Sequence, residues 1–192
     1  MARIGFKNAK YNLHDAETAK LKAVTGGVPM LEKVIEEKFA PEYNNAELYA
    51  SDGLAECDYS FKKGTLTITV ANDDDAKDAE LMGNTITEDE VVKNIADTAP
   101  VVAYGHIVTK LVNGIKKYKV ECFPRVKFNK ITTDAKTRGE GVEFGTTTIE
   151  GVVYPLASDF NGFKAGDWEK HKTFATEQEA IAYLDECLTP TT

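Results

Sequence analysis

Long apolar runs are absent from this 192-residue sequence. No stretch approaches the roughly eighteen consecutive apolar residues of a membrane-spanning helix. The first ten residues, MARIGFKNAK, lack the apolar core of a signal peptide. The sequence therefore predicts a protein with no membrane partner that is made and kept in a cytoplasm.

Cysteine, histidine and serine are scarce. The three cysteines are an odd number, lie far apart and include no C-x-x-C, so we expect reduced, mostly buried thiols and no disulfide framework or metal site. The three histidines form no H-x-x-H motif, and none of the three serines lies in G-x-S-x-G. Because no acid, base and nucleophile converge, the sequence predicts no catalytic residue and no cofactor. The residues concerned are Cys57, Cys122, Cys187, His14, His106, His171, Ser51, Ser60 and Ser158.

Positive charge is also in deficit. Lys and Arg number 23 against 31 Asp and Glu, which gives a net charge of −8. A surface that binds nucleic acid neutralises phosphates with a basic stripe, so this balance argues against such a surface. Apolar residues make up 42% of the chain, an ordinary share for a folded domain, and the length suffices for a sizeable core.

The most informative stretch is residues 100–128, PVVAYGHIVTKLVNGIKKYKVECFPRVKF. Two β-rich runs are joined there by Asn113-Gly114, a dipeptide that tolerates the two positive φ angles of a type I′ turn. A two-residue loop predicts a hairpin over residues 101–128 whose arms are much longer than the usual strand of about five or six residues. We expect such a ribbon to protrude, wrap, or pair with something outside its own sheet.

The predicted register divides the side chains of this ribbon between two faces. Ile107, Tyr118 and Val120 are expected to face the core. His106 lies opposite Glu121, and we interpret the two as a solvated or interface pair in preference to a catalytic base. Lys110 lies opposite Lys117, a mildly repulsive pair that an acidic partner surface would relieve. The charged face is expected to point outward or toward a neighbour; it carries His106, Lys110, Lys117, Lys119 and Glu121.

Other segments also show β patterns. Residues 65–70, TLTITV, alternate cleanly, whereas the alternation of residues 3–13 slips in phase and predicts a bulge near Asn8. Asp52-Gly53 predicts the tip of a second hairpin. Residues 30–39 fit both periods, with a slight preference for helix. Further strands are expected within residues 142–156 and 168–174.

Two helices are expected. The acidic residues 73–75 suit the first turn of a short helix that Gly83 would end. Thr176 and Glu179 form a capping box for a helix over residues 177–188. A second acidic patch, residues 87–97, is interpreted as another short helical turn. Together the patterns predict a mainly β single domain over residues 1–192 with one or two short helices.

Two patterns have both a chemical and a plainer interpretation. Asp73, Asp75 and Asp78 could hold a hard cation, but they lack the spacing and the glycine of a calcium loop, which favours a solvated helix start. Trp168 could stack on a carbohydrate, although a lone Trp in a β protein is more often core or rim. The glycine-rich residues 139–145 lead into a strand and lack the helix N-terminus that a phosphate loop uses.

Four segments, in this order, resemble the major tail proteins of long-tailed phages with non-contractile tails. They are AELYASDGLAE, TLTITVANDDDAKDAELMG, PVVAYGHIVTKLVNGIKKYKVECFPRVKF and GVEFGTTTIEGVVYPL. The resemblance spans nearly the whole chain, and LYASDGLAE and TKLVNGIKKYKV are its most specific parts. MLEKVIEEKF departs from the pattern because it is more helix-like, whereas the resemblance implies a strand there.

The resemblance implies a tail-tube-like fold, a β-sandwich or partly closed barrel with a flanking helix, and a structural role without catalysis. Subunits of this family form rings, typically hexameric, that stack around a tape-measure protein, with tail terminator and distal tail proteins as further partners. DNA would pass through the lumen as cargo only. The protein would be assembled in the host cytoplasm and reside in the virion tail.

Self-assembly is also consistent with the residue patterns. Exposed sheet edges endanger a monomer but allow strand addition between subunits, and a closing heterologous contact gives a ring. Excess acid would keep a lumen repulsive to phosphates. The alternatives are a carbohydrate-binding β-module, a metal-dependent enzyme, and another virion role such as head decoration. The expected subunit-interface residues are Tyr49, Asp52, Gly53, Leu54, His106, Lys110, Asn113, Gly114, Lys117, Lys119 and Glu121.

Overall fold

The computed structural model describes residues 2–190, except 51–52, 72–73, 89 and 134–144. For residues 48–50 and 53–55 it describes the backbone alone. The elements are β1 (Ala2–Leu13), β2 (Val34–Tyr43), β3 (Ala46–Ala50), β4 (Gly53–Asp58), β5 (Phe61–Val70), α1 (Asp75–Met82), β6 (Thr85–Thr87), β7 (Glu90–Val92), β8 (Val101–Val112), β9 (Ile115–Thr133), β10 (Thr147–Val153), β11 (Lys170–Phe174) and α2 (Glu177–Leu188).

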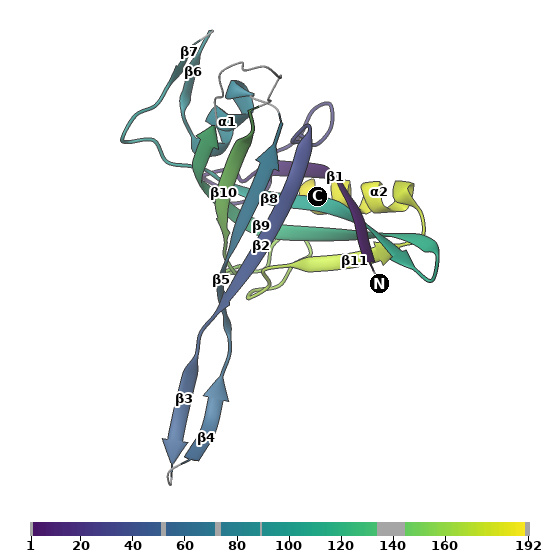
Figure 1. The fold of residues 1–192 in the computed structure, drawn as a ribbon. Coiled ribbons are helices and arrows are strands. Elements are labelled where there is room, and N and C mark those ends of the chain that lie inside the picture. The colour runs from purple at the N-terminus through teal and green to yellow at the C-terminus, as the bar shows by residue number, and fades with distance from the viewer. Residues whose placement is uncertain (1, 51–52, 72–73, 89, 134–144, 191–192) are drawn as a thin grey trace, which may run out of the picture.

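A strongly curled antiparallel sheet of seven strands forms the body of the molecule (Figure 1). Its order is β1-β8-β9-β10-β5-β2, and β11 pairs with β9 as well. The 19-residue β9 is long enough to pair with different strands along its two halves. Its first half pairs with β8 and β11, and its second half pairs chiefly with β10. The mainly β class with two helices is thus confirmed, and the sheet takes the form of a half-barrel.

Both faces of the curled sheet bury apolar side chains. The inner core includes Leu66 and Ile68 of β5 and Phe123 of β9, each of which is at most 1% exposed. The outer core lies between the ribbon and α2, where Ile107 and Leu184 are fully buried. The predicted inward orientation of residues 65–70 is therefore confirmed, as is that of Ile107.

Both helices begin and end at the residues that local chemistry predicts. The Asp74 side chain caps α1 by accepting a hydrogen bond from the Lys77 backbone N–H at 3.2 Å, and Gly83 ends the helix at φ 72°. In α2, Thr176 and Glu179 form the reciprocal capping box. Gly105 lets α2 approach the sheet, because a Cβ there would lie 2.6 Å from Leu184 Cδ1.

The central hairpin has the predicted turn and register. Asn113 and Gly114 adopt φ 51° and 81°, and Val112 pairs with Ile115. The bulge near Asn8 is also confirmed: the pairing of β1 with β8 shifts between Lys7 and Lys10, and Asn8 has φ 54°.

Three expectations about local structure need correction. Residues 34–43 form a strand, so the slight helical preference for residues 30–39 is wrong and the strand implied by the family resemblance is right. Residues 87–97 hold no helical turn within their described part; the short β6–β7 hairpin occupies most of this patch. The third is narrowed and not overturned: the ribbon at residues 101–128 was expected to protrude, wrap or pair outside itself, and it pairs with β1 on one side and with β10 and β11 on the other.

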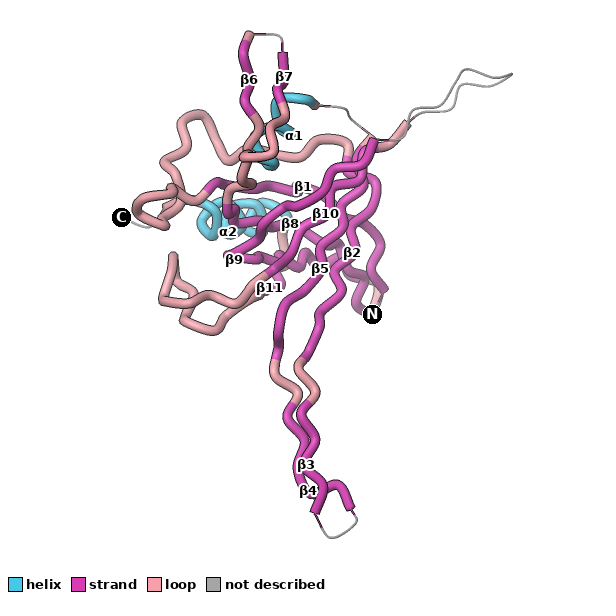
Figure 2. Tube along the Cα trace, turned by 90° about the vertical axis from the view of Figure 1, so that its left-hand side faces the viewer, coloured by secondary structure: helices cyan, strands magenta, loops and turns pink. Residues whose placement is uncertain are grey.

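The protruding element is an arm made of β3 and β4 (Figures 1 and 2). It continues β2 and β5 away from the body. At its base the two strands are joined by a backbone hydrogen bond of 2.7 Å, which the Asn44 N–H donates to the Ser60 carbonyl. The hairpin predicted at Asp52-Gly53 is confirmed, with Ala50 paired to Gly53. Asp52 itself lies outside the described residues.

The turn at Asn113-Gly114 generates a first prediction. Replacing both residues with Val should shift the register of the ribbon, because a β-branched residue at positive φ costs on the order of 1–3 kcal/mol. The free energy of unfolding, measured by urea titration, should fall by a similar amount for each substitution. The control is Gly114→Asn, which keeps access to positive φ and should change little. An unchanged urea midpoint in the double Val variant would contradict the turn assignment.

Candidate functional site

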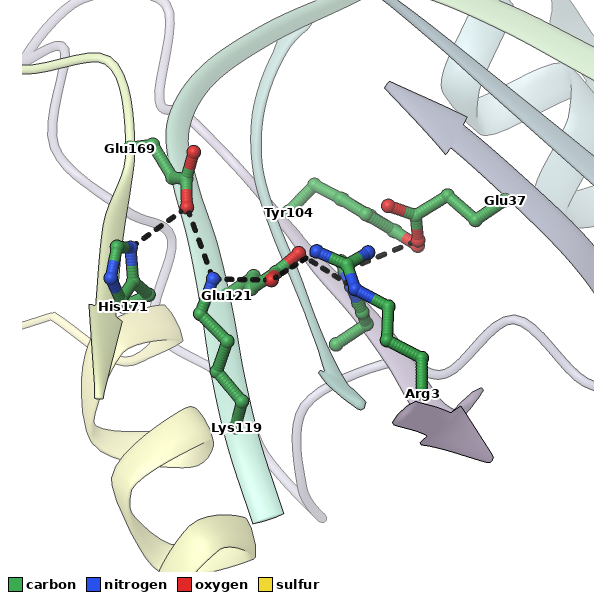
Figure 3. Close-up of polar contacts among 8 residues, drawn as sticks. Arg3, Glu37, Tyr104, Lys119, Glu121, Glu169 and His171 are labelled. Atoms are coloured by element: carbon green, nitrogen blue, oxygen red, sulfur yellow. Dashed lines mark hydrogen bonds and ion pairs between the residues drawn. The ribbon is translucent and has the colours of Figure 1, made fainter. Parts of the chain in front are cut away.

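A chain of charged side chains lies inside the curl of the sheet, where β2 passes over β8 and β9 (Figure 3). His106 is at its centre. Its Nδ1 lies 3.1 Å from Glu37 Oε2, and its Nε2 lies 3.3 Å from Glu121 Oε2. The side chains of the three residues are 2%, 7% and 9% exposed, so the charges are almost fully removed from water. We call Glu37, His106 and Glu121 the buried triad.

Further polar groups extend the buried triad on both sides. The Tyr104 hydroxyl donates to Glu37 Oε2 at 2.6 Å. Lys119 Nζ lies 2.6 Å from Glu121 Oε1. Arg3 forms the exposed end of this group of contacts; its Nη2 lies 3.3 Å from the same oxygen and its side chain is 66% exposed. The contacts thus join strands β1, β2, β8 and β9. Figure 3 shows Arg3 and Lys119 converging on Glu121 from different strands.

Strand geometry explains how these residues come together. Tyr104 and His106 are two positions apart on β8 and therefore share a face. The register places Glu121 of β9 opposite His106. Glu37 reaches them from the far edge of the sheet, because the curl carries β2 across the interior. Burial of charge is tolerable only with close partners, and the triad supplies them.

The environment shifts the pKa of both carboxylates, in opposite directions. Burial raises the pKa of Glu37, although His106 and the Tyr104 hydroxyl oppose that effect. Burial would also raise the pKa of Glu121, but hydrogen bonds from His106 and Lys119 outweigh it and lower that pKa to about 2. Nδ1 of His106 has no hydrogen-bond partner among the described residues, although Glu37 Oε2 lies 3.1 Å away. The triad therefore carries negative charge on Glu121 at neutral pH.

The structure corrects two of the predicted orientations. The cross-strand contact of His106 with Glu121 is confirmed, but the expectation that it is solvated is wrong, because β2 covers it. Lys119 does not point toward a neighbour; its ammonium binds Glu121 and its side chain is 11% exposed. Sequence reasoning missed Glu37, whose strand lay in the ambiguous segment, and Arg3, whose bulged strand gave no partner. The sequence offered one signal, the apolar and aromatic residues Tyr104, Val108 and Phe123 on the same predicted face as His106 and Glu121.

The remaining predicted interface residues lie in two places apart from the buried triad. Asn113 and Gly114 are exposed at the tip of the β8–β9 hairpin, and Lys110 and Lys117 are half-buried opposite each other beside it. Tyr49, Gly53 and Leu54 belong to the β3–β4 arm, and Asp52 lies outside the described residues. The structure therefore brings together only His106, Lys119 and Glu121 from the predicted set.

The two outermost strands of the sheet leave backbone edges open. Within the described residues, no strand pairs with the outer edge of β2. The second half of β1 is covered, since Leu31 donates a backbone hydrogen bond to Ala9 at 2.8 Å, but its first half has no such cover in the described part of the chain. A cavity of about 520 Å³ opens between these edges above the triad. Ile4 and Ile35 line it and are 50% and 57% exposed.

The other chemically interpretable residues have structural partners. Trp168 stacks on Phe61 at 4.2 Å between ring centroids and lies near Phe39 at 5.5 Å. Asp74 caps α1, as expected of a helix start, while Asp73 lies outside the described residues. Cys122 and Cys187 are buried free thiols and Cys57 is exposed. Among the described residues no cluster of three or more potential metal ligands occurs, and no helix is long and apolar enough to cross a membrane.

Comparison with known proteins adds no relative. A scan against protein-family models finds no match to this chain, and a search of curated proteins finds no similar sequence. The functional argument therefore depends on the residues and geometry described above.

The lowered pKa of Glu121 generates a second prediction. A carboxyl whose folded-state pKa lies below its unfolded value stabilises the fold above the unfolded pKa of about 4.5, and this stabilisation is lost as pH falls toward about 2. Glu121→Gln should therefore have a lower free energy of unfolding than the wild type at pH 7. Between pH 4.5 and pH 2 the free energy of unfolding of the wild type should fall, whereas that of the variant should change less. Urea titrations across that pH range measure both effects.

The matched control for this prediction is Glu150→Gln. Glu150 pairs with Lys130 at 3.6 Å, but water reaches both side chains, which are 38% and 58% exposed, so the loss should stay below about 1 kcal/mol. Removing one partner of the buried pair should cost on the order of 3–5 kcal/mol before allowance for the access of water to Glu121. Equal losses in the two variants would show that the triad does not stabilise the curl.

Proposed function

We propose that this protein is a structural subunit that self-assembles into stacked rings and forms the tail tube of a long-tailed phage. The observation that carries the proposal is the open half-barrel, whose outermost strands β1 and β2 both expose unpaired backbone. Such edges attract other strands, and soluble monomers usually protect them. In a ring, the first half of β1 of one copy pairs with β2 of the next copy, and each copy uses both edges.

The side chains of β2 restrict which strand can pair with it. Pro41 offers no backbone donor, and Glu36 and Lys38 place charges of both signs on this exposed strand. Ile35 adds an exposed apolar contact. This combination disfavours indiscriminate aggregation and suits one complementary partner strand. Head-to-tail use of two different edges is a heterologous contact, which closes into a ring when the rotation between copies permits.

The β3–β4 arm supports stacking of the rings. It projects from the body as a two-stranded ribbon, and an isolated ribbon of this kind is marginally stable in water without a surface to pack on (Figure 2). In a tube, an adjacent ring supplies that surface. By family resemblance, the tube encloses a tape-measure protein, meets tail terminator and distal tail proteins at its ends, and passes DNA through a lumen that the net charge of −8 helps to keep free of adhering phosphates. Subunits assemble in the host cytoplasm and end in the virion tail.

Electron microscopy of the concentrated protein tests this function. We expect rings or tubes by negative stain, and a sedimentation coefficient that rises with protein concentration. Replacing residues 46–58 with a two-residue Asn-Gly turn should leave rings but prevent their stacking, because the arm is the element that reaches beyond the body. Monomers at every salt concentration, with and without added tape-measure protein, would exclude the tube function.

A further inference from the structure

Charge is segregated along this chain. Residues 72–100 contain nine acidic residues and two lysines, whereas residues 107–119 contain four lysines and no acid. The first segment forms α1, the β6–β7 hairpin and the turn that leads to β8. The second forms the end of β8, the turn and the start of β9. Each segment presents a surface that combines its charge with exposed apolar side chains.

The acidic segment lines a groove of about 1170 Å³ between α1, the β6–β7 hairpin and the end of β9. Its apolar lining includes Met82, Val91 and Ile131. Glu88 and Glu90 lie on its exposed rim. The charged lining holds five acids and three lysines: Asp75, Asp78, Glu88, Glu90, Asp97, Lys93, Lys127 and Lys130. We call this feature the acidic groove. Beside it, Ile86, Val92 and Ile95 are 48%, 44% and 104% exposed, so apolar surface there is left to water.

The basic segment forms a compact knob at the end of the β8–β9 hairpin, which we call the basic tip. Ile115 and Leu111 are 64% and 37% exposed on it. Lys110 lies opposite Lys117 and Leu111 lies opposite Lys116, so like charges gather there. Glu121 acts on Lys110 from a distance, but its carboxylate is bound by Lys119. None of these three lysines forms an ion pair within the described part of the chain. Partial burial and the ammonium of Lys119 lower the pKa of Lys110, which is the sign expected of crowded positive charge.

The acidic groove and the basic tip lie at opposite ends of one strand. Ala99 and Lys127 line the groove, and Val101 at the start of β8 pairs with Lys127, whereas Val112 at its other end adjoins the turn. A strand of 12 residues spans about 40 Å, so the tip cannot reach the groove of its own chain. Two complementary surfaces that far apart on one molecule can meet only between copies.

We propose that the basic tip of one copy docks into the acidic groove of the next copy. The proposal rests on the self-assembly proposed above and names the side-chain contact that directs it. Opposite charges steer the encounter and set the orientation of the two copies. Ile115 and Leu111 become buried against the apolar lining of the groove, which removes their side chains from water. The contact is head-to-tail, and the first half of β1 lies beside the tip because Ala2 pairs with Leu111. Edge pairing and docking therefore join the same two neighbours.

Charge reversal on each surface tests the proposal. One variant carries Lys116→Glu and Lys117→Glu, and a second carries Glu88→Lys and Glu90→Lys. Alone, each variant places like charges together, so the protein concentration needed for ring formation should rise about tenfold or more. An equimolar mixture should assemble at nearly the wild-type concentration, because each reversed surface then faces its complement. Sedimentation velocity and negative-stain microscopy give the readout, and circular dichroism verifies folding.

A variant of the arm provides the matched control. Glu56→Lys with Asp58→Lys reverses two exposed acids on β4, and this protein should form rings alone and fail to rescue the tip variant. Three results would each overturn the docking contact but not self-assembly. They are rescue of the tip variant by the arm variant, ring formation by either reversed variant alone, and failure of the mixture to form rings. A wild-type chain that stays monomeric under all conditions would overturn both proposals.

Discussion

The buried triad of Glu37, His106 and Glu121 is the constraint on which the rest of the structure depends. Removing a single charge from water costs several kcal/mol unless a close counter-charge and hydrogen bonds offset that cost. The two carboxylates would also repel each other without the imidazole between them. Because each residue comes from a different strand, the offset exists only when β2 curls over β8 and β9. Another path for β2 would remove Glu37 from His106 and uncover the pair of His106 with Glu121, so the three contacts form together only at this curvature of the sheet.

The same curl explains why the sheet remains open. A closed barrel would satisfy both edges, but β2 turns inward to meet the triad, and within the described residues it pairs with β5 alone. The first half of β1 then stands across a cavity of about 520 Å³ from β2, with Arg3 reaching over it toward Glu121. The residues that pair the buried charges thus line the space between the two open edges.

Sequence reasoning succeeded where a feature is complete within a short window. The Asn113-Gly114 turn, the capping box at Thr176 and the Gly83 terminus each depend on residues within a few positions of one another, and all were predicted correctly. It failed for the candidate site because Glu37 acts through a contact with a strand 67 or more positions away. The apolar residues near it recur every four positions, a spacing that suits both a helix and a strand. Only the tertiary curl decides between them.

The position of each lysine along the β8–β9 ribbon determines whether an acid of the same chain pairs with it. Lys110, Lys117 and Lys119 share the face that the sequence assigned to a partner. Lys119 lies within reach of the triad, and its ammonium lies 2.6 Å from Glu121. Lys110 and Lys117 lie opposite each other farther along the ribbon, and Lys110 also pairs with Arg3 of β1. A repulsive pair beside the exposed Ile115 raises the free energy of the monomer. In the docking that we propose, an acidic and partly apolar surface on another copy would lower it again.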